Sequence, residues 1–141
     1  MRYAQTATTS APVQRLWAAV IDVERWPEWM ETYESVRRNQ PGPLRPGHTA
    51  HVKQKGLAGG DWTVTEFDEG SVFSWENVKP GVRFVGRHAV AAEPSGGSRV
   101  MLSFEASGPL SGLVRLFYGR KVRAYLDIEA ARLAAAAVKV A

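Results

Sequence analysis

Residues 11–30 read APVQRLWAAVIDVERWPEWM, and this stretch decides how the rest of the chain is interpreted. Its first half places apolar side chains at the i, i+3, i+4, i+7 spacing of a helix with one buried face, namely Val13, Leu16, Trp17 and Val20. Ser10 is placed to cap this helix, with Pro12 in its first turn. Asp22 is placed to cap a second, very short helix with Pro27 near its start. The stretch therefore predicts two consecutive helices that turn a corner.

On both sides of these helices the chain has the signals of β-strands. Residues 2–8 alternate in polarity and carry threonine and tyrosine, which are typical of strands. After the helices, turns rich in glycine, proline and aspartate separate six further predicted strands, at 32–39, 48–55, 61–68, 71–78, 82–93 and 98–107. The short turns predict an antiparallel meander, in which strands that follow one another in sequence are neighbours in the sheet.

Alternation along these strands separates an aromatic-rich face from a polar face. In residues 82–93, Phe84, His88 and Val90 share one face, and the arginines between them point the other way. The same alternation assigns to the aromatic-rich face Trp62, Val64, Phe73, Trp75, Asn77, Val100, Leu102 and Phe104. An antiparallel sheet with one apolar face needs another element to cover that face.

We expect a long helix over residues 110–139 to be this cover, because no other predicted element is long enough. Its first half carries an apolar stripe that we expect to be buried, made of Leu110, Leu113, Val114 and Phe117. Its second half carries a second stripe, made of Val122, Tyr125, Leu126, Leu133 and Val140. Continuing the first stripe would bury Lys121, so the sequence predicts a bend or a change of register at Gly119.

Length and composition limit the class of protein. The 141 residues are enough for one domain, 1–141, with little room for a second. The absence of cysteine excludes disulfides, thiolate metal sites and cysteine nucleophiles. No apolar run approaches the roughly 20 residues of a membrane helix, and the N-terminus lacks an apolar signal core. We therefore expect a cytoplasmic protein without stable membrane insertion.

The formal net charge of +4 raises the question of an acidic partner. The densest basic clusters are the pair Arg37 and Arg38 and the group Arg115, Arg120, Lys121 and Arg123. Neither is a run of five or more like charges, so we interpret them as solvated surface. The chain has no recognition motif for nucleic acid, and we expect no nucleic-acid partner.

The order strand, two short helices, six strands and one long helix is that of the helix-grip fold, an α+β class in which a curved antiparallel sheet holds a C-terminal helix. The opening stretch 11–30, with its RWPEW run at 25–29, resembles the polyketide cyclase/dehydrase group of the START/Bet v 1-like (SRPBCC) superfamily. Later segments that match the group are WTV at 62–64, FSW at 73–75 and GRHAV at 86–90. The resemblance covers nearly the whole chain and implies a deep cavity between the sheet and the long helix.

Members of this superfamily bind lipids, sterols, polyketides, hormones or aromatic compounds, and some are cyclases or aromatases. The resemblance implies that the apolar face and the long helix supply the ligand-binding residues, which we expect to be Trp62, Phe73, Trp75, Phe84, His88, Phe104, Phe117, Tyr118 and Tyr125. The tryptophans of the opening stretch are better explained as architecture, because large aromatic side chains dominate protein cores.

Three side chains are candidates for chemistry. His88 lies on the apolar face and could donate a hydrogen bond or act as a general acid or base, or it could be a core histidine bonded to a neighbour. Glu129 falls on the inward stripe between Tyr125 and Leu133; it could act as a base, pair with Arg132 or Arg25, or lie at a solvated rim. Tyr125 could orient a ligand or pack its ring and bond water.

The sequence leaves three functions open. The first is binding of a small hydrophobic or aromatic ligand, oriented by His88, Tyr125 and Glu129. The second is a cyclase or dehydratase that moves protons with His88 and either Tyr125 or Glu129. The third is a protein-interaction module, and the apolar residues Val122, Leu126 and Leu133, spread around the last helix, would also allow a homodimer. The pair His48 and His51 lies on opposite faces of its strand, so we expect no metal, and we expect no cofactor.

Overall fold

The computed structural model describes residues 1–139, and the predicted helix residue Val140 lies outside them. The seven predicted strands are present with ends that differ by at most one residue from the predicted ranges. In chain order the elements are β1 (Arg2–Thr9), α1 (Val13–Ile21), the 3-10 turn η1 (Val23–Arg25), α2 (Trp26–Trp29), β2 (Tyr33–Arg38), β3 (Thr49–Gln54), β4 (Gly60–Asp68), β5 (Val72–Lys79), β6 (Val82–Ala92), β7 (Ser98–Ser107) and α3 (Ser111–Lys139).

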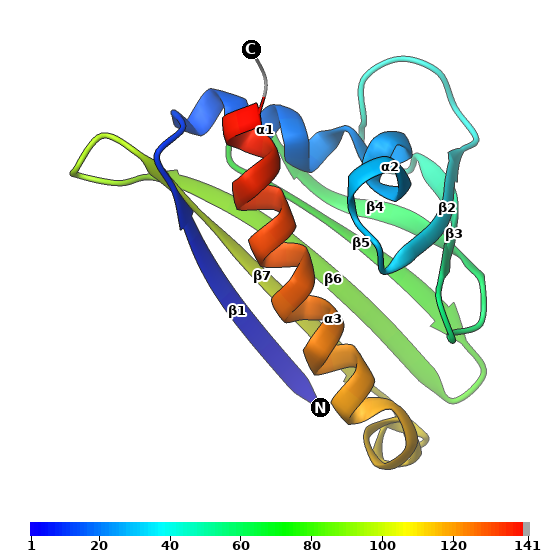
Figure 1. Ribbon diagram of the computed structural model, residues 1–141. Coiled ribbons are helices and arrows are strands. Elements are labelled where there is room, and N and C mark those ends of the chain that lie inside the picture. The colour runs from blue at the N-terminus through cyan, green and yellow to red at the C-terminus, as the bar shows by residue number, and fades with distance from the viewer. Residues whose placement is uncertain (140–141) are drawn as a thin grey trace.

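The strands form one antiparallel sheet in the order β1-β7-β6-β5-β4-β3-β2. Strands β2 to β7 are a meander, as predicted, because each pairs with the next along the chain. The chain crosses from β1 at one edge to β2 at the other through α1, η1 and α2, which lie over one end of the curved sheet (Figure 1). Helix α3 runs along the concave face (Figure 1). The α+β helix-grip fold is confirmed.

The corner between the short helices depends on two tryptophans. The Trp17 indole N–H donates a hydrogen bond to Glu69 Oε1 over 3.1 Å, and the Trp26 indole N–H donates to the carbonyl of Ala19 over 3.2 Å. Both rings are buried, so each N–H needs a partner inside the protein. These bonds fix α1 on the sheet and α2 on α1.

The predicted helix caps were wrong. Helix α1 begins at Val13 with Pro12 in the capping position, and no side chain, including that of Ser10, caps it. The Asp22 carboxylate likewise caps neither α1 nor η1 and instead lies 3.8 Å from the Arg25 guanidinium. Proline at the capping position has no side-chain oxygen to accept a hydrogen bond from the N–H groups of the first turn, so α1 begins without a side-chain cap.

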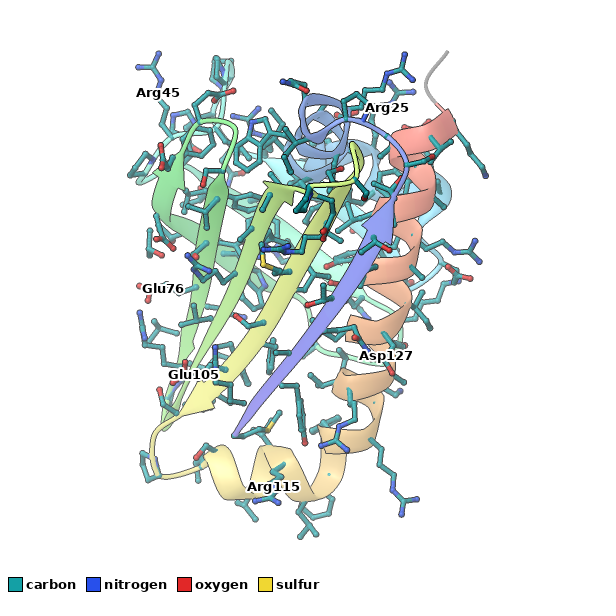
Figure 2. The ribbon with its side chains drawn as sticks, turned by 90° about the vertical axis from the view of Figure 1, so that its left-hand side faces the viewer. Arg25, Arg45, Glu76, Glu105, Arg115 and Asp127 are labelled. Atoms are coloured by element: carbon teal, nitrogen blue, oxygen red, sulfur yellow. The ribbon has the colours of Figure 1, made fainter. Side chains whose placement is uncertain are left out.

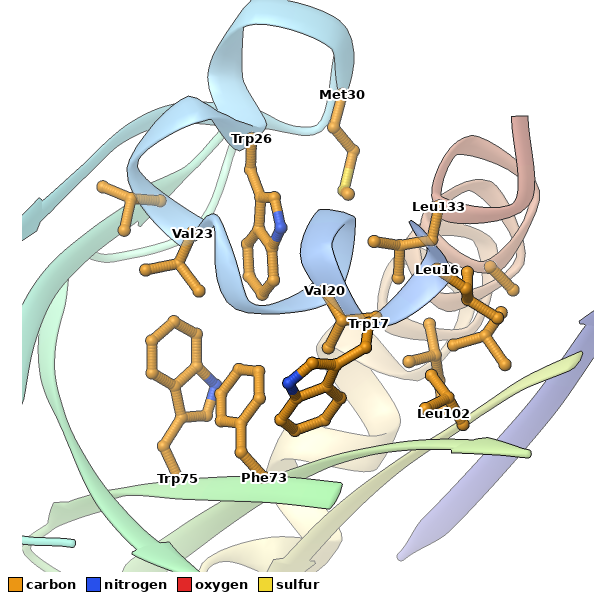
Figure 3. Packing of buried hydrophobic residues seen from close by; sticks show 14 of the residues in the cluster. Leu16, Trp17, Val20, Val23, Trp26, Met30, Phe73, Trp75, Leu102 and Leu133 are labelled. Atoms are coloured by element: carbon orange, nitrogen blue, oxygen red, sulfur yellow. The ribbon is translucent and has the colours of Figure 1, made fainter. Parts of the chain in front are cut away.

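A cluster of large buried side chains lies beneath α1 and α2 (Figure 3). The Trp26 ring is central there, with ring centroids 5.3 Å from Tyr33 and 5.6 Å from Trp75. Leu133 of α3 and Leu16 of α1 are both fully buried beside this cluster (Figure 3). The tryptophans of the opening stretch are thus structural residues, as expected.

Helix α3 changes direction along its length, as the mismatch of its two apolar stripes predicted. Figure 2 shows the part with Arg115 lying across the end of the sheet and the part with Asp127 running along it. Gly119 lies between them, is buried, and lets the helix approach β1: a Cβ atom there would lie 2.8 Å from the Tyr3 hydroxyl.

The expected burial of the first stripe of α3 was wrong. Leu110, Leu113 and Phe117 are exposed, Phe117 to 72%, and Val114 is the only residue of the four that is not. The bend carries the start of the helix past the ends of the strands, so the sheet covers one narrow side of it (Figure 2). The second stripe does face inward, because Leu126 and Leu133 are buried.

Candidate functional site

A cavity of about 290 Å³ lies between the concave face of the sheet and α3. Strands β3 to β7 form one wall, the loop after β3 adds Leu57 and Ala58, and α3 forms the other wall. The lining is mostly apolar, with a few polar side chains, as is typical of ligand sites. The residues that line it are Val52, Gln54, Leu57, Ala58, Trp62, Asn77, Lys79, Val82, Phe84, Phe104, Val114, Tyr118, Val122, Tyr125, Leu126 and Glu129.

Aromatic side chains from the sheet form the floor of this cavity. The rings of Phe84 and Phe104, on neighbouring strands, lie with centroids 5.7 Å apart. Trp62 of β4 borders the same space, and its ring centroid lies 5.9 Å from that of Trp75. Strand pleating produces this floor because alternate residues of each strand point toward α3.

Two tyrosines of α3 close the cavity from the helix side. Tyr125 donates a hydrogen bond from its hydroxyl to the carbonyl of Lys55 over 2.5 Å. This bond joins the helix to the segment after β3, and the Tyr125 hydroxyl is therefore already engaged. Tyr118 lines the cavity and is also 45% exposed, so the cavity reaches the molecular surface near this residue.

Glu129 is a buried carboxyl group without a cationic partner in the described chain. It is 8% exposed and accepts a hydrogen bond from Gln54 Nε2 over 3.0 Å. Burial raises the pKa of Glu129 to about 7, although its contacts with Tyr33 and Gln54 favour the ionised form. Of the alternatives left open for Glu129, pairing with an arginine is not found, because Arg132 binds Glu31 and Arg25 binds Glu28.

His88 is buried in the aromatic cluster and neutral. Its ring stacks on that of Phe73 with centroids 4.3 Å apart, and its Nδ1 lies 3.3 Å from the Phe73 carbonyl. A carbonyl oxygen can only accept, so Nδ1 carries the proton and Nε2 is the acceptor nitrogen. Burial lowers the pKa of His88 to about 4.

A second, smaller cavity of about 40 Å³ connects the two ionisable groups. Both His88 and Glu129 border it, together with Trp75 and Gly86. Gly86 has no side chain, and a Cβ atom there would come within 3.3 Å of the Trp75 indole nitrogen, so this glycine leaves part of the space open. Five residues line both cavities: Val52, Gln54, Trp62, Leu126 and Glu129.

A family model described as "Polyketide cyclase / dehydrase and lipid transport" matches residues 1–138. The chain belongs to this family. The resemblance that residues 11–30 indicated is thereby confirmed. None of the curated proteins compared with the chain matches it.

Solved structures similar to this member of the polyketide cyclase/dehydrase and lipid transport family share its fold at low sequence identity. The hypothetical protein jhp0584 from Helicobacter pylori superposes with a TM-score of 0.80 and 10% identity over 96% of this chain and 86% of its own. TTHA0849 from Thermus thermophilus has a TM-score of 0.77 and 15% identity over 98% and 97% of the two chains.

A third similar structure has a title that mentions a biosynthetic pathway. It is the di-domain ARO/CYC protein BexL from the BE-7585A pathway, with a TM-score of 0.70 and 16% identity over 97% of this chain and 48% of that one. At these identities the three structures show the fold alone.

The predicted ligand-binding residues of this family member fall into three groups. Trp62, Phe84, Phe104, Tyr118 and Tyr125 line the larger cavity. Trp75 and His88 border the smaller one, and Phe73 is fully buried in the core behind it. Phe117 lies outside, exposed on α3. Alternation predicts which face of the sheet a strand residue occupies. The position of α3 above that face decides which of its residues pack in the core and which line a cavity.

Sequence reasoning missed two polar residues of the cavity. Asn77 is 7% exposed, lines the larger cavity, and has no hydrogen-bond partner for its side-chain amide among the described residues. Gln54 holds the Glu129 carboxylate. Alternation had placed Asn77 on the inner face, and an amide at such a position is a signal for a polar contact with a ligand. Nothing in the local sequence pointed to Gln54.

The ionisable residues do not form a metal centre in the part of the chain that the structure describes. No group of three or more His, Cys, Asp or Glu side chains in residues 1–139 is arranged to hold a metal ion. His51 instead lies 2.9 Å from Asp61, and His48 lies 3.3 Å from Arg38. No helix within these residues is both long and apolar enough to cross a membrane.

Proposed function

We propose that this protein binds a small hydrophobic or aromatic ligand in the larger cavity between the sheet and α3. The observation that carries the proposal is the mostly apolar cavity of about 290 Å³ with a few polar groups in its wall, Asn77 and the Gln54–Glu129 pair among them. Transfer of an apolar molecule from water into this space supplies affinity, and the polar groups select its orientation.

The volume of the cavity limits the size of the ligand. Ligand pockets usually span roughly 300–1,000 Å³, so about 290 Å³ is at the lower end of that range. We infer a ligand with one or two rings or a short acyl chain, in preference to a sterol. The unpartnered Asn77 amide favours a ligand with a carbonyl or hydroxyl group, because a buried amide gains from a hydrogen bond.

A thermal-shift screen against flavonoids, short fatty acids, aromatic polyketides and sterols tests this proposal. A ligand at about 100 times its Kd stabilises the folded state by about 2.7 kcal/mol and raises the melting temperature. The screen is repeated with Val122→Phe, which places a ring in the cavity. The matched control is Val78→Phe, because Val78 is 66% exposed and does not line the cavity.

Binding in the cavity requires that Val122→Phe abolishes the shift and that Val78→Phe retains it. A ligand that stabilises all three proteins equally binds elsewhere, and the proposal then fails. It also fails if no compound in the panel raises the melting temperature of the wild type.

A second candidate function is a cyclase or dehydratase, and the smaller cavity favours it. Around this space stand a neutral imidazole, His88, and a carboxyl group, Glu129, whose pKa is raised to about 7. A carboxyl group with a pKa of about 7 is suited to donate or accept a proton near neutral pH, whereas His88, with its pKa lowered to about 4, stays neutral there and can accept a hydrogen bond through Nε2. This candidate rests on the same binding site.

Mass spectrometry of the bound compound shows whether the protein converts its ligand, as an enzyme would, or only binds it, as a carrier would. Each compound that shifts the wild type is incubated with wild type, His88→Gln and Glu129→Gln, and loss of water or ring closure is followed. An enzyme gives product with the wild type alone, while all three proteins still bind. Unchanged compound with all three proteins indicates a carrier.

A further inference from the structure

The positive charge of this protein is concentrated in one helical segment. Between Glu105 and Asp127 the chain has no acidic residue and four basic ones: Arg115, Arg120, Lys121 and Arg123. Without these four, the remaining 14 basic residues equal the 14 acidic residues in number. The whole formal excess of +4 therefore belongs to the first part of α3.

These four cations are exposed and free of acidic partners within the described chain. The ion pairs of residues 1–139 use other basic residues, such as Arg83 with Glu76 and Arg132 with Glu31. Arg123 lies with its guanidinium carbon 4.6 Å from the centre of the Tyr3 ring, which leaves its charge uncompensated. An external anion would meet four unneutralised cations on this segment.

The same segment carries most of the exposed apolar surface. Of the seven large apolar or aromatic side chains exposed in residues 1–139, five lie between positions 110 and 118: Leu110, Leu113, Leu116, Phe117 and Tyr118. Leu116 and Phe117 are 73% and 72% exposed. Apolar side chains gathered in this way indicate a contact surface, whereas single ones do not.

The arrangement around the helix separates this surface from the cavity. At 3.6 residues per turn, Leu116 lies on the side of α3 opposite Val114 and Tyr118, which line the cavity, and Leu113 and Phe117 flank Leu116 on the exposed surface. We call the outward surface formed by Leu113, Leu116, Phe117, Arg115, Arg120 and Arg123 the basic apolar face, whereas Lys121 points toward Gly56 in the loop after β3. A shallow hollow on it is lined by Gly112, Arg115, Leu116, Phe117 and Arg120.

The chemistry of the basic apolar face favours a membrane surface over other occupants. A second copy of the chain in a two-fold contact would bring Arg115, Arg120 and Arg123 against the same three arginines. A nucleic acid would use the cations but leave Leu113, Leu116 and Phe117 unexplained. A bilayer with anionic lipids accounts for both the cations and the exposed apolar side chains. The cations contact the headgroups, and the apolar side chains enter the boundary between headgroups and acyl chains.

We propose that residues 111–123 of α3 dock parallel to the surface of an anionic bilayer, with Leu113, Leu116 and Phe117 inserted at the headgroup level. Arg115, Arg120 and Arg123 bind lipid phosphate groups beside the inserted residues. Val114 and Tyr118 on the opposite side of the same helix line the cavity, so docking brings the cavity within one helix diameter of the lipid. The proposal concerns a surface and stands apart from the identity of the ligand.

Vesicle co-sedimentation tests this proposal directly. The full chain is mixed with vesicles of phosphatidylcholine alone, and with vesicles of equal parts phosphatidylcholine and phosphatidylglycerol. We expect binding to the mixed vesicles only, and we expect it to weaken as salt is added. The paired substitutions Leu116→Asn with Phe117→Asn, and Arg115→Gln with Arg120→Gln, should each weaken binding at least about tenfold.

Two control substitutions outside the basic apolar face test whether the loss of vesicle binding is specific to that face. Val78→Asn removes an exposed apolar side chain from the sheet. Arg45→Gln removes an exposed cation at the far end of the molecule from Arg115 (Figure 2). Both should bind mixed vesicles as the wild type does.

Four results would overturn the proposal. The first is a wild type that stays in solution with mixed vesicles, and the second is binding that both paired variants retain. The third is a concentration-dependent dimer, measured by sedimentation velocity, that Leu116→Asn with Phe117→Asn abolishes, because this would assign the face to a second copy. Tight binding of a mixed-sequence DNA duplex that only the arginine variant loses would assign it to nucleic acid instead.

Discussion

At the scale of single residues, Glu129 and His88 have opposite effects on stability as pH changes. The pKa of Glu129 is raised to about 7 from 4.5, so between these values the folded state binds more protons and stability falls as pH rises. The pKa of His88 is lowered to about 4 from 6.5, so the unfolded state binds more protons and stability falls as pH drops. Each effect amounts to roughly 3 kcal/mol, and the two largely cancel between pH 4.5 and 6.5.

Glu129→Gln should make the protein more stable relative to the wild type at pH 8 than at pH 5. Glutamine keeps an oxygen for Gln54 and has no charge to bury, so the cost of ionising the carboxyl group disappears. Urea unfolding of both proteins at pH 5, 6.5 and 8 measures the difference, which should grow by up to about 3 kcal/mol. Parallel stability curves for the two proteins would contradict the raised pKa.

His88→Gln should remove the loss of stability on acidification. In this variant the stability should fall as pH rises from 5 to 7, because only the Glu129 effect remains. The imidazole signals of the wild type, followed by NMR, give an independent check, since His88 should stay neutral down to about pH 4. Titration of the His88 ring near pH 6.5 would show that it is accessible to water.

At the scale of elements, the bend of α3 gives the two parts of one helix different positions on the sheet. Its second part buries Leu126, Leu133 and Ala137 against the sheet and α1, and its first part leaves that face and lies across the end of the sheet (Figure 2). The close approach at Gly119, where a side chain would meet the Tyr3 hydroxyl, marks the transition. A straight helix would carry its start away from the sheet.

Gly119→Ala should gain less stability than Gly112→Ala in the same helix. Alanine in a helix is favoured over glycine by about 1 kcal/mol, and Gly112 has open space around its Cβ position. At Gly119 the new Cβ would lie 2.8 Å from the Tyr3 hydroxyl, and moving that ring offsets the gain. Urea unfolding measures both variants. Adding Tyr3→Phe should restore the stability gain of Gly119→Ala. If Gly119→Ala and Gly112→Ala gain equal stability while Tyr3 is present, the close approach is contradicted.

At the scale of the whole molecule, the fold divides into a packed end and a hollow end. Beneath α1 and α2 the large side chains interlock and Trp26, Phe73 and Leu16 are almost fully buried (Figure 3). Toward the other end the sheet and α3 separate around the larger cavity. The packed end can support the hollow end, because a cavity forfeits packing that a core would provide.

Trp26→Ala and Trp62→Ala should therefore separate stability from binding. Loss of the buried Trp26 ring should cost about 3–5 kcal/mol. Trp62 is half-buried at the cavity wall, so its loss should cost about 1–2 kcal/mol while it weakens the ligand-induced thermal shift. Urea unfolding and thermal shift measure the two effects. Equal stability losses would contradict the division into two ends.

The candidate site could be predicted in part. The periodicity of the strands correctly placed Trp62, Phe84 and Phe104 on the inner face, and that of the helix placed Tyr125 and Glu129 toward them. It did not distinguish cavity from core along a strand, so Phe73 was predicted in the ligand site and lies in the core. The three side chains that suggested a dimer contact, Val122, Leu126 and Leu133, face inward, while homodimer formation itself remains a prediction.

The sequence by itself determined the fold, because local signals suffice for it: the helical spacing in 11–30, period-two alternation in the strands and turn residues between them. The family followed from the same residues. Only the tertiary structure decided where the cavity lies, that Glu129 has Gln54 as partner, and that the start of α3 is exposed. These features depend on the distance between a bent helix and a curved sheet, to which residues far apart in the chain contribute.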